Sequence, residues 1–335
     1  MRAVSSFMVF VAVFALAMPQ IAVAGPSPRD VSEFVCELAS APRFTPEERS
    51  VARGVISAKL SEIGLVPSEM PYQWDPEQFA AWLLPWYPAE YMGSGVNLTA
   101  VLPATEPSDR WVLVGAHYDT VPNSPGAEDN ASGVAAALAV AVMLQQVESR
   151  PVNVMFVFFD QEEPGLVGSI MGTVYLAMGG IFPEGVHLLD SVSWDGDNDR
   201  ATQLMYWYEP DNPFVPQPYD YLGDVLPLYQ AADAYLDDLL PPPMRPGDIV
   251  PAITGFSDHA GVIVGSMMLG LPAFPPAVTI GTEWVSGDDI SPYVHGPFTN
   301  DPTGEDDTCD HVDPQQLLRS AAMVAVAVEL YMNPL

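Results

Sequence analysis

Histidine and carboxylate residues gather in four segments of this sequence, each at or just after the end of a short apolar run. Short apolar runs are typical of buried strands, and open α/β sheets place their sites at the carboxyl ends of strands. The candidate residues are His117, Asp119 and Asp129, then Glu162 and Glu163, then Asp190, and finally His295.

The chemistry of these side chains favours zinc. Imidazole and carboxylate donors without a thiolate suit Zn²⁺, and suit Mn²⁺ or Co²⁺ less well. One tetrahedral ion cannot use all of the donors, whereas two ions that share a carboxylate can. The proposed ligands are His117, Asp129, Glu163, Asp190 and His295.

A two-metal centre also needs a carboxylate that is free of metal and can take a proton from water. The adjacent Glu162 and Glu163 can divide these tasks between them. Asp119 is close enough to His117 in the sequence to accept the second N–H of its ring, which would fix the tautomer. Two Zn²⁺ ions per chain are therefore the predicted cofactors.

Each motif taken alone has an ordinary explanation. An H-x-D at a strand end is common, and Glu-Glu after a strand is more often a solvated loop. A buried carboxylate cluster, however, needs cations. The arginines nearest in sequence, Arg110, Arg150 and Arg200, are too few to supply them. The coincidence of all four clusters at strand ends therefore favours metal.

Strand and helix patterns alternate along the chain, which predicts an α/β fold with a mostly parallel central sheet and helices on both faces. We expect strands at 96–102, 112–116, 153–159, 187–189, 203–208 and 276–281. We expect helices at 31–38, 45–63, 134–144, 166–178, 221–239 and 314–331. Residues 74–92 are predicted to form a covering loop or a short helix, and 241–251 a proline-rich connector. No repeat or linker appears, so 25–335 is predicted to be a single domain.

Composition excludes several partners. Among 335 residues, 43 are acidic and 11 basic, giving a net charge of −32. Nucleic acid and anionic membrane surfaces need clustered cations and are not expected partners.

The first 24 residues have the pattern of a signal peptide, with Arg2, an apolar core and the small residues Ala22 and Ala24 before the cut. The mature chain is expected to be exported, periplasmic or secreted, without a membrane anchor. Cys36 and Cys309 can form one disulfide in such a compartment, or remain as two buried thiols.

Three motifs together resemble the co-catalytic di-zinc aminopeptidase family, which includes bacterial leucyl aminopeptidases and glutamate-carboxypeptidase-like peptidases. They are HYDT at 117–120, GAEDNASG at 126–133 and FDQEEPGLVGS at 159–169. SDHAGV at 257–262 and HVDPQQL at 311–317 resemble further landmarks of the family. The resemblance implies the di-zinc exopeptidase fold and a metalloprotease that removes N-terminal residues from peptides.

The resemblance also implies a role for each residue. His117 and Asp190 would hold one zinc, Glu163 and His295 the other, and Asp129 would bridge them. A hydroxide between the metals would attack the scissile carbonyl. Glu162 would be the general base, Asp119 would orient His117, and Ser257 would help to hold the oxyanion.

Departures from the family pattern leave alternatives open. Ser191 stands where the family often has methionine, so Asp195 and Asp197 are rivals to Asp190. The segment before the last helix is long, so His311 is a rival to His295. His187 and His259 are expected to be structural.

Two acidic stretches, 195–199 and 300–307, are predicted to be solvated turns in preference to calcium sites.

Two other functions remain on the same fold. A glutaminyl cyclase would be a zinc acyltransferase, but its motif after the bridging aspartate resembles D-S-A, which differs from the Asp129-Asn130-Ala131 found here. A non-catalytic binding module would have lost metal ligands, and the sequence retains all of them.

Overall fold

The computed structural model describes residues 25–79, 85–196, 198–207, 222–240, 245–271, 275–282, 294 and 307–333. The predicted signal peptide, Asp197 and the predicted ligand His295 lie outside the described residues.

The core of the molecule is one sheet in the strand order β1-β2-β4-β3-β5-β8-β6-β7. The strands are β1 (Ser68–Gln73), β2 (Ser94–Leu102), β3 (Trp111–His117), β4 (Asn153–Phe159), β5 (Gly185–Leu189), β6 (Thr202–Tyr206), β7 (Ile249–Ile253) and β8 (Ala277–Gly281). The central strands β4, β3, β5 and β8 are parallel, whereas β1, β2 and β6 join antiparallel neighbours. The α/β prediction is confirmed, with a mixed sheet whose parallel centre carries the candidate residues.

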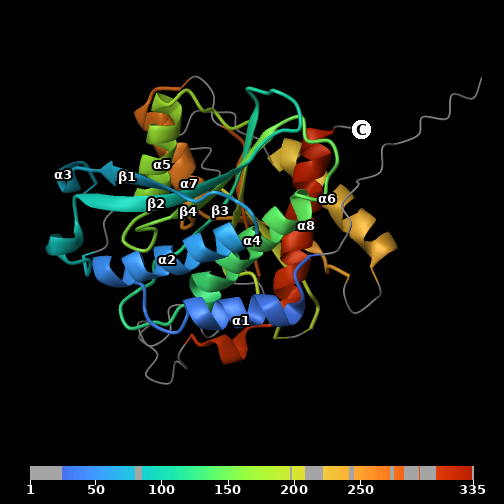
Figure 1. Ribbon diagram of the computed structural model, residues 1–335, viewed down its shortest axis with the longest axis horizontal. Coiled ribbons are helices and arrows are strands. Elements are labelled where there is room, and N and C mark those ends of the chain that lie inside the picture. The colour runs from blue at the N-terminus through green and yellow to red at the C-terminus, as the bar shows by residue number, and fades with distance from the viewer. Residues whose placement is uncertain are drawn as a thin grey trace, which may run out of the picture.

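Helices cover both faces of the sheet (Figure 1). One layer contains α4 (Gly133–Leu144) and α8 (Pro314–Met332), and α1 (Pro28–Leu38), α2 (Pro46–Glu62) and α6 (Leu222–Leu239) pack beside them. The other layer contains α5 (Val167–Met178) and α7 (Asp258–Met268). The short elements are α3 (Pro76–Phe79), η1 (Ala89–Tyr91), the π-helical turn η2 (Ala127–Ser132) and η5 (Cys309–His311).

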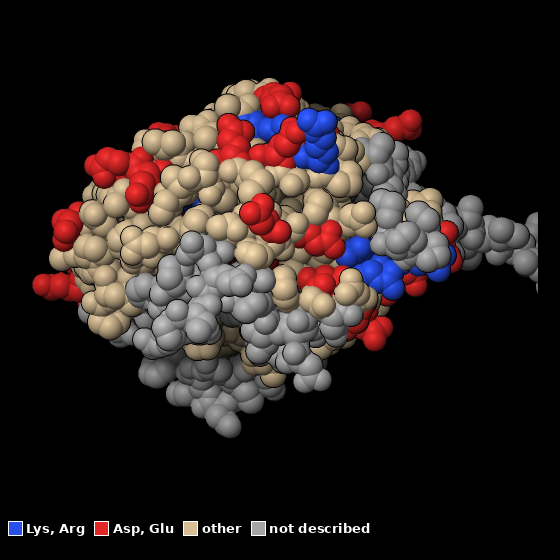
Figure 2. All heavy atoms as spheres, turned by 90° about the horizontal axis from the view of Figure 1, so that it is seen from below, with Lys and Arg blue, Asp and Glu red and all other residues tan. Residues whose placement is uncertain are grey.

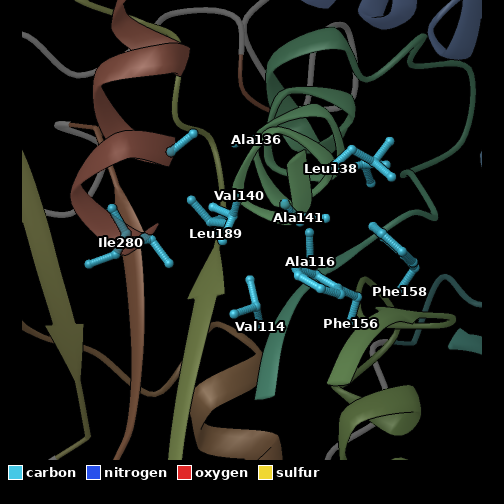
Figure 3. Packing of buried hydrophobic residues seen from close by; sticks show 14 of the residues in the cluster. Val114, Ala116, Ala136, Leu138, Val140, Ala141, Phe156, Phe158, Leu189 and Ile280 are labelled. Atoms are coloured by element: carbon cyan, nitrogen blue, oxygen red, sulfur yellow. The ribbon is translucent and has the colours of Figure 1, made fainter. Parts of the chain in front are cut away.

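Successive side chains of the buried strands point to opposite faces of the sheet and pack against the two helix layers in turn. Phe156 and Phe158 of β4 face α4 together with Val114 of β3 (Figure 3), whereas Val157 and Phe159 join the cluster under α5 and α7. Strands buried on both faces read as continuous apolar runs, which is why β3 and β4 were predictable from the sequence.

Helix α4 is a core helix. Ala127–Leu144 is long and apolar enough to cross a membrane, but 94% of this window is buried inside the protein. A helix that is apolar on all sides packs in the interior of a soluble domain.

Three elements were missed or misread. Strand β7 lies in the predicted proline-rich connector, and β1 was not predicted. Both are edge strands, where Pro251 and Pro71 cost no inter-strand hydrogen bond. Helix α7 was also not predicted, because glycines weaken its helical pattern. A Cβ on Gly261 would lie 2.0 Å from Ser169 Oγ, so this glycine permits the close packing of α7 on α5.

The two cysteines form a disulfide. Cys36 in α1 joins Cys309 in η5, with the Cα atoms 5.1 Å apart. The bond therefore ties the first helix to the segment that precedes the last one.

Acidic side chains are spread over the surface. On the face in Figure 2, carboxylates are widely distributed and few Lys or Arg side chains lie among them. The large negative charge thus belongs mainly to solvated positions, although several carboxylates are buried in the interior.

Candidate metal centre

Three of the predicted ligands converge at the carboxyl edge of the parallel strands. His117 is the last residue of β3, Asp190 directly follows the adjacent strand β5, and Asp129 lies in η2, which leads into α4. All three are buried, with exposed fractions of 1%, 6% and 6%. Separate segments of the chain thus bring one imidazole and two carboxylates to one point.

The geometry fits a divalent cation. His117 Nε2 lies 3.1 Å from Asp129 Oδ1 and 3.6 Å from Asp190 Oδ1. One ligand atom from each of the three residues lies within 4.8 Å of the other two. One imidazole nitrogen with two carboxylate oxygens is a donor set that zinc accepts.

The electrostatics of His117 also favour positive charge at this point. Burial alone would lower the pKa of its ring, but the carboxylates of Glu162, Asp119, Asp129 and Asp190 raise that pKa well above its usual value. The protein therefore surrounds this imidazole with more negative charge than a neutral ring requires.

Glu162 and Glu163 lie in the loop that follows β4, and Asp119 holds this loop. Asp119 Oδ1 accepts the Glu162 N–H at 3.0 Å, and Oδ2 accepts the Glu163 N–H at 3.3 Å. Its Oδ1 is 3.6 Å from His117 Nδ1, which is longer than a hydrogen bond. The structure thus gives Asp119 firmer contacts to the two glutamates than to the histidine.

The two glutamates differ in their surroundings. Glu163 Oε1 accepts the Val121 N–H at 3.1 Å, which ties it to the segment after Asp119. Burial raises the pKa of Glu162 well above its usual value, while His117 lowers it. A carboxylate with a raised pKa is suited to exchange protons near neutral pH.

The residue before Glu162 connects the loop to the predicted covering segment. Gln161 has a left-handed backbone with φ of 60°. Its side-chain amide donates to Tyr87 Oη at 2.8 Å and to the Tyr91 carbonyl at 3.0 Å, and its Oε1 accepts from Tyr72 at 3.0 Å. Tyr87 and Tyr91 of the predicted covering segment are thereby anchored beside Glu162.

The DNASG motif joins two ligand segments. Asn130 Nδ2 donates to the Leu189 carbonyl at 2.9 Å, next to Asp190. Ser132 Oγ accepts the Val192 N–H at 3.1 Å, and the Glu128 carboxylate accepts the Ser193 N–H at 3.0 Å. The peptide bond between Asp129 and Asn130 is cis. These contacts hold the turn that carries Asp129 against the turn that carries Asp190.

Asp190 has a second support, and its rivals lie elsewhere. Ser257 Oγ donates to Asp190 Oδ2 at 2.8 Å, so this predicted oxyanion group also contacts a candidate ligand. Asp195 pairs with Arg319 at 3.3 Å and is absent from the cluster around His117. His311 lies in η5 and is likewise absent from that cluster.

The remaining histidines have neutral partners. His187 Nδ1 lies 2.8 Å from Tyr229 Oη, and His259 contacts Thr279 Oγ1 at 2.9 Å and the Thr254 carbonyl at 2.8 Å. Burial lowers the pKa of both rings to about 4. Such contacts are those of structural histidines.

The expectation that arginines are too few near the site is wrong. Arg49 of α2 lies 2.7 Å from Asp160, at the start of the glutamate loop, and both side chains are buried. Arg43 is also buried, and its charge faces Asp119, Asp129 and Glu163. Both arginines come from the N-terminal segment, so a search of the neighbouring sequence missed them. Arginines are scarce in so acidic a chain, and this scarcity was the available sign that the few present could pair with buried carboxylates.

Two buried aspartates were also missed. Asp307 was assigned to a solvated acidic turn, but it is 0% exposed and accepts the N–H groups of Glu128 and Asp129. Asp258, the first residue of α7, is buried, and within the described residues its Oδ1 has no hydrogen-bond partner. Its charge raises the pKa of Glu162, so it lies in the same electrostatic environment.

Comparison with known proteins matches the segment that carries this geometry. Residues 97–171, which contain the first three motifs up to the start of α5, match Peptidase family M28. A probable lipoprotein aminopeptidase, LpqL of Mycobacterium tuberculosis, is 50% identical over 58 residues, which is 17% of this chain and 12% of that protein.

Residues 97–171 of this chain are similar to Peptidase family M28. The predicted resemblance to co-catalytic zinc aminopeptidases is thereby confirmed. The matched part of this chain spans only 12% of the length of LpqL, so the match concerns the motif segment and not that whole protein.

Solved structures share the fold of this chain over most of its length. BSAP, a zinc aminopeptidase from Bacillus subtilis, superposes with a TM-score of 0.66 at 14% identity, covering 92% of this chain and 96% of that one. A glutaminyl cyclase from Porphyromonas gingivalis gives a TM-score of 0.62 at 21% identity, covering 91% of this chain and 98% of that one. The fold alone therefore does not separate peptidase from cyclase.

Proposed function

We propose that this protein is a zinc-dependent aminopeptidase. The observation that carries the proposal is the position of His117 Nε2, which faces Asp129 and Asp190 at the carboxyl edge of the sheet beside Glu162 and Glu163. The similarity of residues 97–171 to Peptidase family M28 supports the same reaction class.

We propose a two-zinc site, which the cluster of His117, Asp129 and Asp190 supports; the predicted ligand His295 lies outside the described part of the chain. His117 and Asp190 would hold one ion, Glu163 and His295 the other, and Asp129 both. When bound, such a pair of ions lowers the pKa of water and polarises a scissile carbonyl.

Glu162 is proposed as the general base. Its backbone N–H is fixed by Asp119, which leaves the carboxylate as the free proton acceptor of the loop. It would take a proton from the attacking water and then give it to the leaving amine. Burial of the carboxylate keeps bulk water from competing in this transfer.

The proposed substrate is a peptide with a free N-terminus. The candidate site contains more carboxylates than the charge of one histidine can balance. The ammonium group at the N-terminus of a substrate would interact favourably with these carboxylates. Asp258 is a candidate for this contact, because its buried Oδ1 has no hydrogen-bond partner among the described residues. Recognition of the ammonium would restrict cleavage to the first peptide bond.

Export is proposed from the signal-like residues 1–24. The Cys36–Cys309 disulfide supports this proposal, because disulfides persist in oxidising compartments. N-terminal sequencing of the protein from its host would test it, with Gly25 as the expected first residue.

The activity is tested with purified protein on aminoacyl chromogenic amides and on peptides with N-terminal glutamine, each with and without a chelator. We expect chelator-sensitive release from the amides, restored by zinc. Cyclisation of the glutamine peptides without amide hydrolysis would instead identify a glutaminyl cyclase. Zinc binding without either reaction would identify a binding module.

A further inference from the structure

The loop from Tyr118 to Asp129 joins two candidate ligands, and buried charges hold its main chain from both sides. Arg43 donates to carbonyl groups of this loop, and Asp307 accepts its N–H groups. Neither residue belongs to the ligand set or to the proposed proton transfer.

The guanidinium group of Arg43 donates hydrogen bonds to backbone carbonyls. Nε donates to Tyr118 at 2.6 Å, Nη1 to Pro125 at 2.5 Å and Nη2 to Gly126 at 2.8 Å. Burial lowers the pKa of Arg43 to about 10, so the group remains charged at neutral pH. These hydrogen bonds all go to backbone carbonyls, so the guanidinium fixes the loop while its charge acts on the nearby carboxylates of Asp307, Asp119 and Asp129.

Asp307 acts on the end of the loop that carries Asp129. Its Oδ1 accepts the Glu128 N–H at 2.7 Å, and its Oδ2 accepts the Asp129 N–H at 3.0 Å. Its backbone carbonyl accepts the Ala127 N–H at 3.1 Å. One residue thus satisfies three successive N–H groups that lead up to the proposed bridging ligand.

Gly126 lies where the two supports meet. It has a left-handed φ of +64°, and a Cβ there would lie 2.4 Å from the Asp129 carbonyl and 2.7 Å from Arg43 Nη2. The turn at this position therefore requires glycine. It lies between the carbonyls that accept from Arg43 and the N–H groups that donate to Asp307.

The disulfide joins the segments that supply both supports. Cys36 is in α1, which ends shortly before Arg43, and Cys309 is two residues after Asp307. The two positions are 273 residues apart in the sequence. The covalent bond therefore links the two segments that carry Arg43 and Asp307.

We propose that Arg43 and Asp307 are positioning residues that fix Asp129 in the metal centre, with the Cys36–Cys309 disulfide as their tether. The proposal rests on the proposed function only in taking Asp129 as a metal ligand. Groups that hold metal ligands in place typically change metal affinity by about 10- to 100-fold when they are removed.

The test measures zinc affinity by competition with a chromophoric chelator, and records the visible spectrum of the Co²⁺-substituted protein. The variants are Asp307→Ala, Asp307→Asn and Arg43→Lys, with a Cys36→Ser/Cys309→Ser double variant. Asp310→Asn and Arg29→Lys are matched controls, because both residues are exposed and lie on the same segments.

We expect Asp307→Ala to weaken zinc binding about 10- to 100-fold and to alter the Co²⁺ spectrum. Asp307→Asn keeps one acceptor oxygen and should be intermediate, as should Arg43→Lys and the double cysteine variant. The controls should match the wild type. Hydrogen exchange at the amides of Glu128 and Asp129 should accelerate in the Asp307 variants.

Folded Asp307→Asn and Arg43→Lys proteins with wild-type zinc affinity, spectrum and amide exchange would overturn the proposal. If Asp307→Ala does not fold, these two conservative variants decide the result. Because zinc affinity is measured without substrate, the outcome is separate from peptidase activity. A wild-type protein that binds zinc but cleaves nothing would refute the proposed function and leave this test valid.

Discussion

Two buried histidines on neighbouring strands have opposite environments. His117 ends β3, and its Nε2 faces the carboxylates of Asp129 and Asp190. His187 lies within β5, paired with Val114 of β3, and its ring contacts Tyr229 and Tyr331. Carboxylates raise the pKa of His117, whereas burial lowers that of His187 to about 4.

The difference shows that position on the strand decides the role of each histidine. A side chain inside a strand points into a helix layer, where α6 and α8 offer His187 only neutral groups. A side chain at the carboxyl end reaches the loops of several strands, where carboxylates can gather. Burial alone favours a neutral histidine such as His187, whereas burial among carboxylates gives the candidate metal site at His117.

The largest expected effect is loss of metal when the first histidine is changed. His117→Gln removes a proposed ligand, so we expect loss of bound zinc and of activity. His187→Gln removes an imidazole of equal size from the adjacent strand and should retain zinc. Elemental analysis of the two purified proteins makes the comparison, and equal zinc contents would show that His117 is not a ligand.

A second change keeps the metal and removes the proton acceptor. Glu162→Gln should lower kcat by about 100- to 10,000-fold, the usual contribution of a general base. Zinc content should be unchanged, because Glu162 is not a proposed ligand. Glu148→Gln, at an exposed position, is the control for the same chemical change. Wild-type turnover in Glu162→Gln would exclude the general-base role.

A third change tests the buried cation beside the glutamate loop. Arg49→Met leaves Asp160 buried without its partner at 2.7 Å, and such losses cost about 3–5 kcal/mol of unfolding free energy. Adding Asp160→Asn should recover part of this loss, because the uncompensated charge is gone. Urea unfolding of the single and double variants measures both effects, and equal stability of Arg49→Met and wild type would contradict the argument.

The smallest effect concerns the structural histidine. The pKa of His187 falls from 6.5 to about 4 on folding, so the unfolded chain binds a proton that the native chain does not. His187 therefore lowers stability as pH falls from about 6.5 to about 4, by at most about 3 kcal/mol.

The His187→Gln variant should lose less stability than the wild type over this pH range. Unfolding free energies at pH 7 and pH 4.5, compared between the two proteins, isolate the contribution from that of other groups. If the unfolding free energies of the two proteins changed equally between pH 7 and pH 4.5, His187 would not be held neutral in the folded protein.

The sequence predicted well what depends on local pattern. The runs that became β3 and β4 are apolar throughout, and the residues at their ends are those that meet at the sheet edge. The order of His117, Asp129 and Asp190 after successive elements was therefore enough to place them together. The edge strands β1 and β7 were missed because their exposed sides and prolines leave no continuous apolar signal.

The supports of the site could not be predicted in this way. Arg43, Arg49 and Asp307 act through contacts with segments that are distant in the chain, and no periodicity marks such contacts. The interaction of Asp307 with Glu128 spans 179 positions. A buried ionic group is recognised only when its partner is known, and the partner is set by the tertiary fold.

The position of Asp307 near the end of the chain has a consequence for biosynthesis. The ribosome completes the loop that carries Asp129 long before it adds the aspartate that holds this loop. A nascent or truncated polypeptide that ends before Asp307 has the loop without its anchor. We therefore expect this loop to reach its final conformation only after the segment that carries Asp307 has been synthesised.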